Sequence, residues 1–198
     1  MSVIAAVCDG TRAYMAADSR LTLDGLMLRQ HPSAMQKCSR LHNGLLVGLA
    51  GYSGLTAALL ESLSNEMVWP DLTPWETENP EGFECYLEER GAELRQFMTE
   101  WATKSPQGAE DTDDFEMLIA CGHTVARMTS DGGVTLHALP YFAIGSGQAV
   151  ALGAAGALLA VGTPSAVAVR LAVEMACRHV PECGDPVVLV CSDIEEDL

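Results

Sequence analysis

Positive charge is scarce in this sequence. Only eleven of the 198 residues are Lys or Arg, against 27 Asp or Glu, which gives a formal net charge of -16 at pH 7. Nucleic acids and anionic membrane surfaces both bind clustered basic residues, so the composition argues against either partner. The excess of acidic residues is typical of a surface that keeps a protein soluble. The more specific alternative is that these residues line the wall of an acidic cavity.

Long hydrophobic segments and targeting features are also missing. The apolar stretch at residues 3–8 is too short for the hydrophobic region of a signal peptide, and no basic segment precedes it. The longest weakly polar run, residues 149–163, falls short of the roughly 18 apolar residues that a membrane span needs. We interpret this Ala- and Gly-rich run as a buried helix and expect no membrane partner.

The sequence also lacks paired cysteines. Its seven cysteines are odd in number and form no C-x-x-C motif. This pattern is typical of free thiols in a reducing compartment, which predicts a cytoplasmic protein. We predict no metal site and no cofactor.

What remains is the composition of a folded domain. Hydrophobic residues make up 48% and charged residues 19% of the chain. A chain of this length can bury about two thirds of its extended surface, and no linker or internal repeat divides it. We expect a single domain over residues 1–198.

Short β-rich runs alternate with two pairs of helical segments. Asp9-Gly10 and Asn43-Gly44 predict the turns of two hairpins. Strands are predicted at residues 3–8, 13–17, 35–41, 45–50, 115–121, 124–129, 134–139 and 187–191. Helices are predicted at residues 53–67, 83–104, 148–161 and 164–179, with connections at 69–80 and 105–114. This order predicts an α+β protein in which two facing sheets lie between helix layers, a four-layer αββα sandwich.

The second residue offers chemistry that depends on its place in the chain. Once Met1 is removed, Ser2 carries a hydroxyl that can attack a carbonyl and an α-amine that can act as base. The ordinary pKa of an α-amine, about 7.7 to 8.0, suits that role near neutral pH. A Met-Ser start is common, so this hypothesis depends on other residues.

Asp18 and Lys37 are the next elements of such a site. Asp18 ends the second strand of a hairpin whose first strand begins at Ser2, so antiparallel pairing returns it to the start of the chain. Lys37 is one of two lysines, and an ammonium paired with a carboxylate can activate a neighbouring hydroxyl. The alternatives are an aspartate that caps a turn and a lysine on a strand edge.

With these residues the sequence resembles the catalytic β-subunits of the proteasome core and the related bacterial HslV-type peptidases. MAADSRLTLDG resembles the second strand and turn of that family, and QKCSRL resembles its lysine-bearing segment. GLAGYSG resembles the turn whose backbone N–H forms the oxyanion hole, and FAIGSGQA resembles the Gly-Ser-Gly that precedes the third helix. The resemblance implies the N-terminal nucleophile hydrolase fold and the catalytic residues Ser2, Asp18, Lys37, Gly51 and Ser146.

The resemblance also implies a function and partners. We expect an N-terminal serine endopeptidase that hydrolyses unfolded polypeptides inside a homo-oligomeric single or double ring of six or seven subunits per ring. An ATP-dependent unfoldase is a candidate partner. Arg20 and Leu49 are implied at the substrate, and the aliphatic Leu49 suggests hydrophobic P1 residues of modest size.

Two features depart from an active member of that family, and the state of Met1 adds a condition. Serine lacks the methyl group that fixes the rotamer of the usual threonine, which predicts slower turnover. The usual Asp-x-x-Ser pair is absent, and His179, Cys183 and Asp185 are the candidates to replace it, with a plain turn as the alternative. A retained Met1 would block the α-amine. The rival functions are an inert ring or scaffold subunit and an amidase of the wider group acting on small amides.

Overall fold

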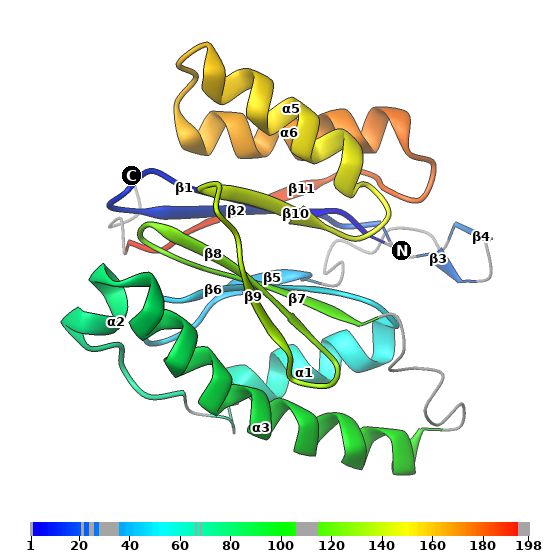
Figure 1. Cartoon of the computed structure of the whole chain (residues 1–198). Coiled ribbons are helices and arrows are strands. Elements are labelled where there is room, and N and C mark those ends of the chain that lie inside the picture. Colours follow the sequence, from blue (N-terminus) through cyan, green and yellow to red (C-terminus); the bar gives the residue numbers. More distant parts are fainter. Residues whose placement is uncertain are drawn as a thin grey trace.

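The computed structural model describes residues 2–20, 22–23, 26–27, 36–65, 67, 69–105 and 115–193. Its two main sheets are antiparallel and lie face to face, with helices on both outer faces (Figure 1). This is the αββα sandwich that the order of elements predicted.

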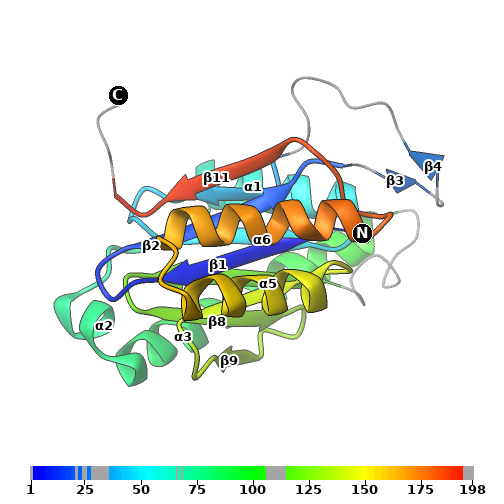
Figure 2. The same ribbon diagram turned by 90° about the horizontal axis from the view of Figure 1, so that it is seen from above.

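The first sheet contains the start of the chain. Its strands, in spatial order, are β10 (Tyr141–Ile144), β1 (Ile4–Cys8), β2 (Ala13–Asp18) and β11 (Val187–Cys191). The register pairs Ile4 with Ala17 and with Ile144. Helices α5 (Gln148–Ala160) and α6 (Ser165–His179) lie side by side across its outer face (Figure 2).

The second sheet has five strands. In order they are β5 (Cys38–Arg40), β6 (Leu46–Ala50), β7 (Glu116–Cys121), β8 (Thr124–Thr129) and β9 (Val134–Leu136). Helices α1 (Ser53–Asn65) and α3 (Pro80–Lys104) cover its outer face (Figure 1). The remaining elements are the short helix α2 (Pro74–Glu78) and the paired strands β3 (Thr22–Leu23) and β4 (Leu26–Met27).

Side chains alternate between the layers along the strands. On β1, Ile4 packs in the core between the sheets, whereas Ala5 packs toward α5 and α6. The sheets approach closely at Gly48 of β6, where an added Cβ would lie 2.5 Å from Ile4 Cγ2 and 2.8 Å from Met15 Sδ. Because Ser2 shares the alternation of Ile4, its side chain belongs to the face that meets the second sheet.

Some elements differ from the predicted ones. Helix α2 lies in the stretch expected to be a connection, because Thr73 and Glu76 form a capping box around Pro74. Strand β10 was not predicted separately, since only four residues separate Pro140 from the turn at Gly145. The third predicted strand begins at residue 38 instead of 35, and residues 106–114 of the predicted acidic loop lie outside the described residues.

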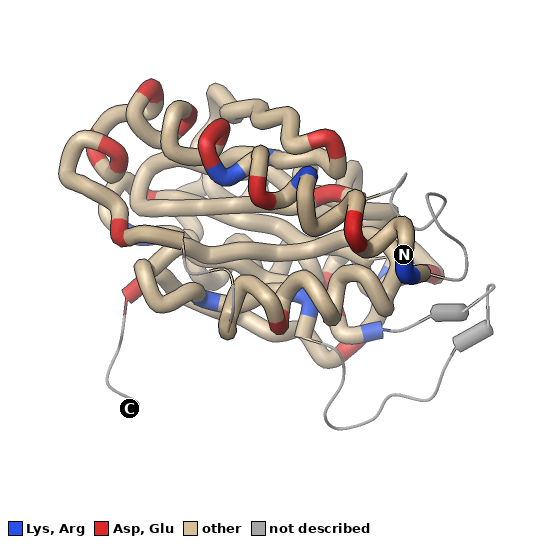
Figure 3. Tube along the Cα trace, turned by 90° about the horizontal axis from the view of Figure 1, so that it is seen from below, with Lys and Arg blue, Asp and Glu red and all other residues tan. Residues whose placement is uncertain are grey.

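No helix in the described ranges has both the length and the apolar character needed to cross a membrane. All seven cysteines are free thiols. Figure 3 shows the acidic residues on several separate elements of the molecule.

Candidate active site

Strand ends from both sheets meet at one end of the sandwich. The antiparallel register brings the start of β1 next to the ends of β2 and β10, and the start of β11 next to Asp18. In the second sheet, Glu116 at the start of β7 pairs with Ala50 at the end of β6. Ser2 lies two residues before β1 and is therefore close to where these segments converge.

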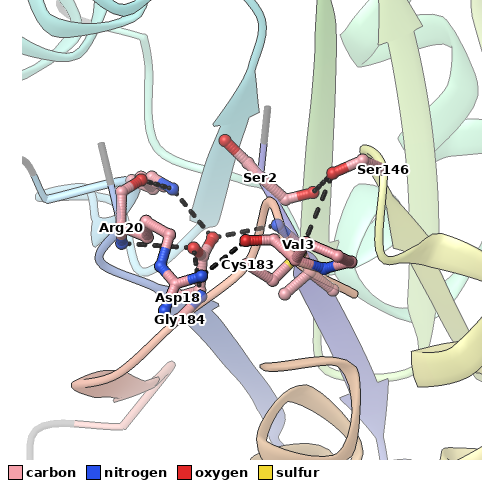
Figure 4. A network of polar contacts seen from close by, with 9 residues as sticks. Ser2, Val3, Asp18, Arg20, Ser146, Cys183 and Gly184 are labelled. Carbon is pink, nitrogen blue, oxygen red and sulfur yellow. Dashed lines mark hydrogen bonds and ion pairs between the residues drawn. The ribbon is translucent and has the colours of Figure 1, made fainter. Parts of the chain in front are cut away.

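Asp18 forms hydrogen bonds with the start of β1 and with Arg20, Lys37 and Gly184 (Figure 4). Its N–H donates to the Val3 carbonyl at 3.1 Å, and its Oδ1 accepts the Val3 N–H at 2.9 Å. Oδ1 also accepts from Lys37 Nζ at 2.8 Å, while Oδ2 accepts the N–H groups of Arg20 at 3.2 Å and Gly184 at 3.1 Å. Four donors thus satisfy a fully buried carboxylate, which is the condition for keeping such a charge inside a protein.

Lys37 joins the two sheets. Its side chain is only 4% exposed, and its ammonium donates to Asp18 and, at 2.7 Å, to the Arg20 carbonyl. Its own carbonyl accepts the Leu49 N–H at 2.8 Å, which extends the pairing of β5 with β6. The ion pair therefore links the end of β2 in the first sheet to the segment that enters β5 in the second.

A glycine-rich turn holds the other side of Ser2. The Ser146 hydroxyl donates to the Ser2 carbonyl at 3.2 Å, and the Gly147 N–H donates to the same oxygen at 3.3 Å. Gly145 has a φ of +85°, and an added Cβ there would collide with the Ser2 carbonyl, so this position requires glycine. Figure 4 shows the Ser2 side chain directed away from Ser146.

Cys183 is the member of the 179–185 segment that lies beside Ser146. Its Sγ is 3.7 Å from Ser146 Oγ, and its side chain is fully buried. His179 and Asp185 are both exposed. Burial raises the pKa of the Cys183 thiol above its usual value of 9.0, so the thiol is neutral near pH 7.

Arg20 holds this segment against the network. Its guanidinium donates to the Pro181 carbonyl, and its backbone contacts both Asp18 and Lys37. One residue earlier, the Ser19 N–H donates to the Gly184 carbonyl at 3.1 Å. The chain just after β2 and the loop before β11 are thereby fixed to each other.

Most of the predicted site residues lie in one hydrogen-bonded network, whereas Gly51 and Leu49 lie outside it. Those that share the network are Ser2, Asp18, Lys37, Ser146 and, mainly through its backbone, Arg20. Gly51, with a φ of 146°, follows β6 at the same end of the sandwich. The Leu49 side chain packs in the core between the second sheet and its helices, apart from the network. Met1 lies outside the described residues.

Sequence reasoning missed several groups at this end. The N–H donors of Val3, Gly147 and Gly184 belong to the backbone, which has no residue-type signature. Of these, the Val3 contact could have been inferred, because the hairpin register places that residue opposite Asp18. Cys183 was one of three candidates, and its selection depends on the path of the loop before β11.

Two further features bear on ligands. Within the described residues, no group of three or more His, Cys, Asp or Glu side chains is placed to hold a metal ion. A hollow of about 500 Å³ lies at the opposite end of the sandwich, at the β1–β2, β5–β6 and β7–β8 turns. None of the predicted site residues lines it.

Solved structures with the same architecture cover nearly the whole chain. BPH from Thiobacillus denitrificans has a TM-score of 0.71 at 20% identity, over 98% of this chain and 100% of that one. Its complex with epoxomicin has a TM-score of 0.70 at 20% identity, over 96% and 97%. The chain has the fold of proteasome-type subunits. HslV from Trypanosoma brucei is similar at a TM-score of 0.67 and 21% identity, over 96% and 98% of the two chains.

A more distant likeness has the same fold. Anbu (ancestral beta-subunit) from Yersinia bercovieri has a TM-score of 0.64 at 16% identity, over 96% of this chain and 80% of that one. No family model and no curated protein matches the sequence. The proteasome-type fold of this chain is therefore supported by structure at low sequence identity.

Proposed function

We propose that this chain is a self-compartmentalising N-terminal serine peptidase subunit, in which Ser2 hydrolyses peptide bonds once Met1 has been removed. The observation that carries the proposal is the buried Lys37–Asp18 ion pair beside the start of the Ser2 strand. Replacing a buried ion pair by apolar residues is often neutral or stabilising, so stability alone is a weak reason to keep one. Its position next to Ser2 supports a chemical role.

The hydrogen bonds fix the peptide group that follows Ser2. Ser146 and Gly147 bind its carbonyl oxygen, and Asp18 binds its N–H, which belongs to Val3. With that group held at both ends, the hydroxyl and the α-amine of Ser2 are the groups left to act on a substrate. Such fixed geometry removes much of the entropic cost of bringing reactants together.

The reaction then follows in two steps. Ser2 Oγ bonds to the substrate carbonyl carbon while the α-amine takes the hydroxyl proton and passes it to the departing amine. Water next attacks the ester, releases the acyl product and restores the Ser2 hydroxyl. The Lys37 ammonium favours the developing alkoxide, and the Gly51 N–H would stabilise the oxyanion, a contribution of about 3 to 4 kcal/mol.

Intact-mass analysis with epoxomicin tests this proposal. Epoxomicin is a peptide epoxyketone, and its two electrophilic carbons suit a residue that offers both a hydroxyl and an amine. We expect the untreated chain to have lost Met1 and the treated chain to gain one adduct. Ser2→Ala should abolish the adduct, whereas Ser39→Ala, on β5, should retain it. A retained Met1 without an adduct would contradict the proposal and favour the inert ring or scaffold subunit.

Native mass spectrometry tests the assembly. We expect a homo-oligomer with six or seven subunits per ring, in which Arg20 contributes to substrate binding and an ATP-dependent unfoldase supplies unfolded polypeptide. Leu49 is left out of this proposal, because its side chain is buried under the helices of the second sheet. A small assembly that labels with epoxomicin and cleaves only small amides would instead favour the amidase.

A further inference from the structure

Glu116 connects the second sheet to the turn that holds Ser2. Its Oε2 accepts the Gly145 N–H at 3.2 Å, and its Oε1 forms an ion pair with the Arg127 guanidinium on β8. Glu116 is the first residue of β7, whereas Gly145 directly follows β10 in the first sheet. The contact therefore crosses between the sheets at the same end as the Lys37–Asp18 pair.

The position of Glu116 on its strand is unusual for a charged residue. Leu118 and Ala120, which share its alternation on β7, are fully buried in the core between the sheets. Glutamate seldom occupies such a position unless it is paired. Arg127 supplies the pairing charge, and the Gly145 N–H donates to the second carboxylate oxygen, so the turn provides one of the two polar contacts of this half-buried side chain.

The turn transmits this constraint to Ser2. Gly145 packs so closely that an added Cβ would collide with the Ser2 carbonyl and lie 3.5 Å from Ala50 Cβ. The next residue, Ser146, donates to the same Ser2 carbonyl. A shift of Gly145 would therefore move the donors that fix the Ser2–Val3 peptide group.

We propose that Glu116 is a positioning residue for Ser2, which it orients through the Gly145–Ser146–Gly147 turn from the opposite sheet. Hydrogen bonds to a charged acceptor are about twice as strong as neutral ones, so the carboxylate holds the turn better than an amide would. The effect on reactivity rests on the proposed function, whereas the effect on the turn does not.

Glu116→Gln tests the inference, because it keeps the shape of the side chain and removes its charge. Glu174→Gln is the matched control, since Glu174 on α6 is 25% exposed against 22% for Glu116 and also pairs with an arginine, Arg170, at 3.0 Å. The rate of hydrogen–deuterium exchange in the peptide that contains Gly145 measures how firmly the turn is held in place. The rate of epoxomicin labelling at saturating probe reports the reactivity of Ser2.

We expect Glu116→Gln to speed exchange in that peptide about tenfold, the size expected when a hydrogen bond to a charged group is weakened. The maximal labelling rate should fall by a similar factor while the probe concentration for half-maximal rate stays unchanged. Glu174→Gln should alter neither measurement. A merely structural role would lower thermal stability without this selective loss of labelling rate.

The outcomes separate the two proposals. Unchanged exchange at the turn in Glu116→Gln overturns the inference. Faster exchange with unchanged labelling also overturns it, because Ser2 would then not depend on the turn. If the unaltered chain is not labelled at all, the proposed function fails, and faster exchange in Glu116→Gln still supports the placement of the turn by Glu116.

Discussion

The two ends of the sandwich are built from the same strands, yet they place their ion pairs differently. At the Ser2 end, the side chains of Lys37 and Asp18 are 4% and 0% exposed. At the opposite end, those of Arg12 and Asp193 are 43% and 44% exposed, beside the hollow of about 500 Å³. Strand pairing alone therefore does not make the candidate site. The distinguishing feature is a buried carboxylate, that of Asp18, whose oxygens accept four hydrogen bonds.

Matched changes to the two ion pairs should give the largest difference. Asp18→Asn places an amide NH₂ among four donors and leaves Lys37 buried without its counter-charge, which should cost about 3 to 5 kcal/mol of unfolding free energy. Asp193→Asn removes an exposed carboxylate and should cost no more than about 1 kcal/mol. Urea denaturation measures both values, and epoxomicin labelling should be lost only in Asp18→Asn. Equal losses of unfolding free energy in the two variants would show that the two ion pairs contribute equally to stability.

Two glycines provide a second, smaller contrast. Gly10 and Gly145 have φ angles of +96° and +85°, but an added Cβ meets nothing within 4 Å at Gly10 and collides with the Ser2 carbonyl at Gly145. Gly10→Ala should therefore cost only the left-handed backbone penalty, about 1 to 2 kcal/mol. Gly145→Ala should cost more, because the turn must also move, and it should slow labelling of Ser2. Thermal unfolding and labelling rates measure the pair. Equal labelling rates in both variants would contradict the role assigned to the turn.

The sequence predicted the layers of the fold because its hairpin turns and helical runs are local features. The last strand, Val187–Cys191, has the predicted bounds, whereas α2 was missed because Pro74 and its neighbours resemble a loop until the capping contact forms. Asp18 could be placed near Ser2 from the hairpin register alone. The position of Glu116 beside the turn could not be predicted in this way, because its contact with Gly145 depends on how two separate sheets pack.

Cys183→Ser should give the smallest effect. The substitution keeps a group that can hydrogen-bond to Ser146, so the labelling rate should stay within about threefold of the unaltered chain, which corresponds to less than 1 kcal/mol. The exposed Cys85 provides the control variant, Cys85→Ser, on helix α3.

The pH dependence of labelling distinguishes two roles for this thiol. Because burial raises its pKa above 9.0, Cys183 is uncharged through the neutral range, and its replacement removes no titrating charge from the surroundings of Ser2. The labelling profiles of Cys183→Ser and the unaltered chain should therefore rise over the same pH range. If a Cys183 thiolate were instead the base, activity would be lost below the thiol pKa, and Cys183→Ser would remove that limb of the profile. A profile that changes shape on substitution would show that the buried thiol ionises, and the Ser2 end would then contain a charged group besides Asp18 and Lys37.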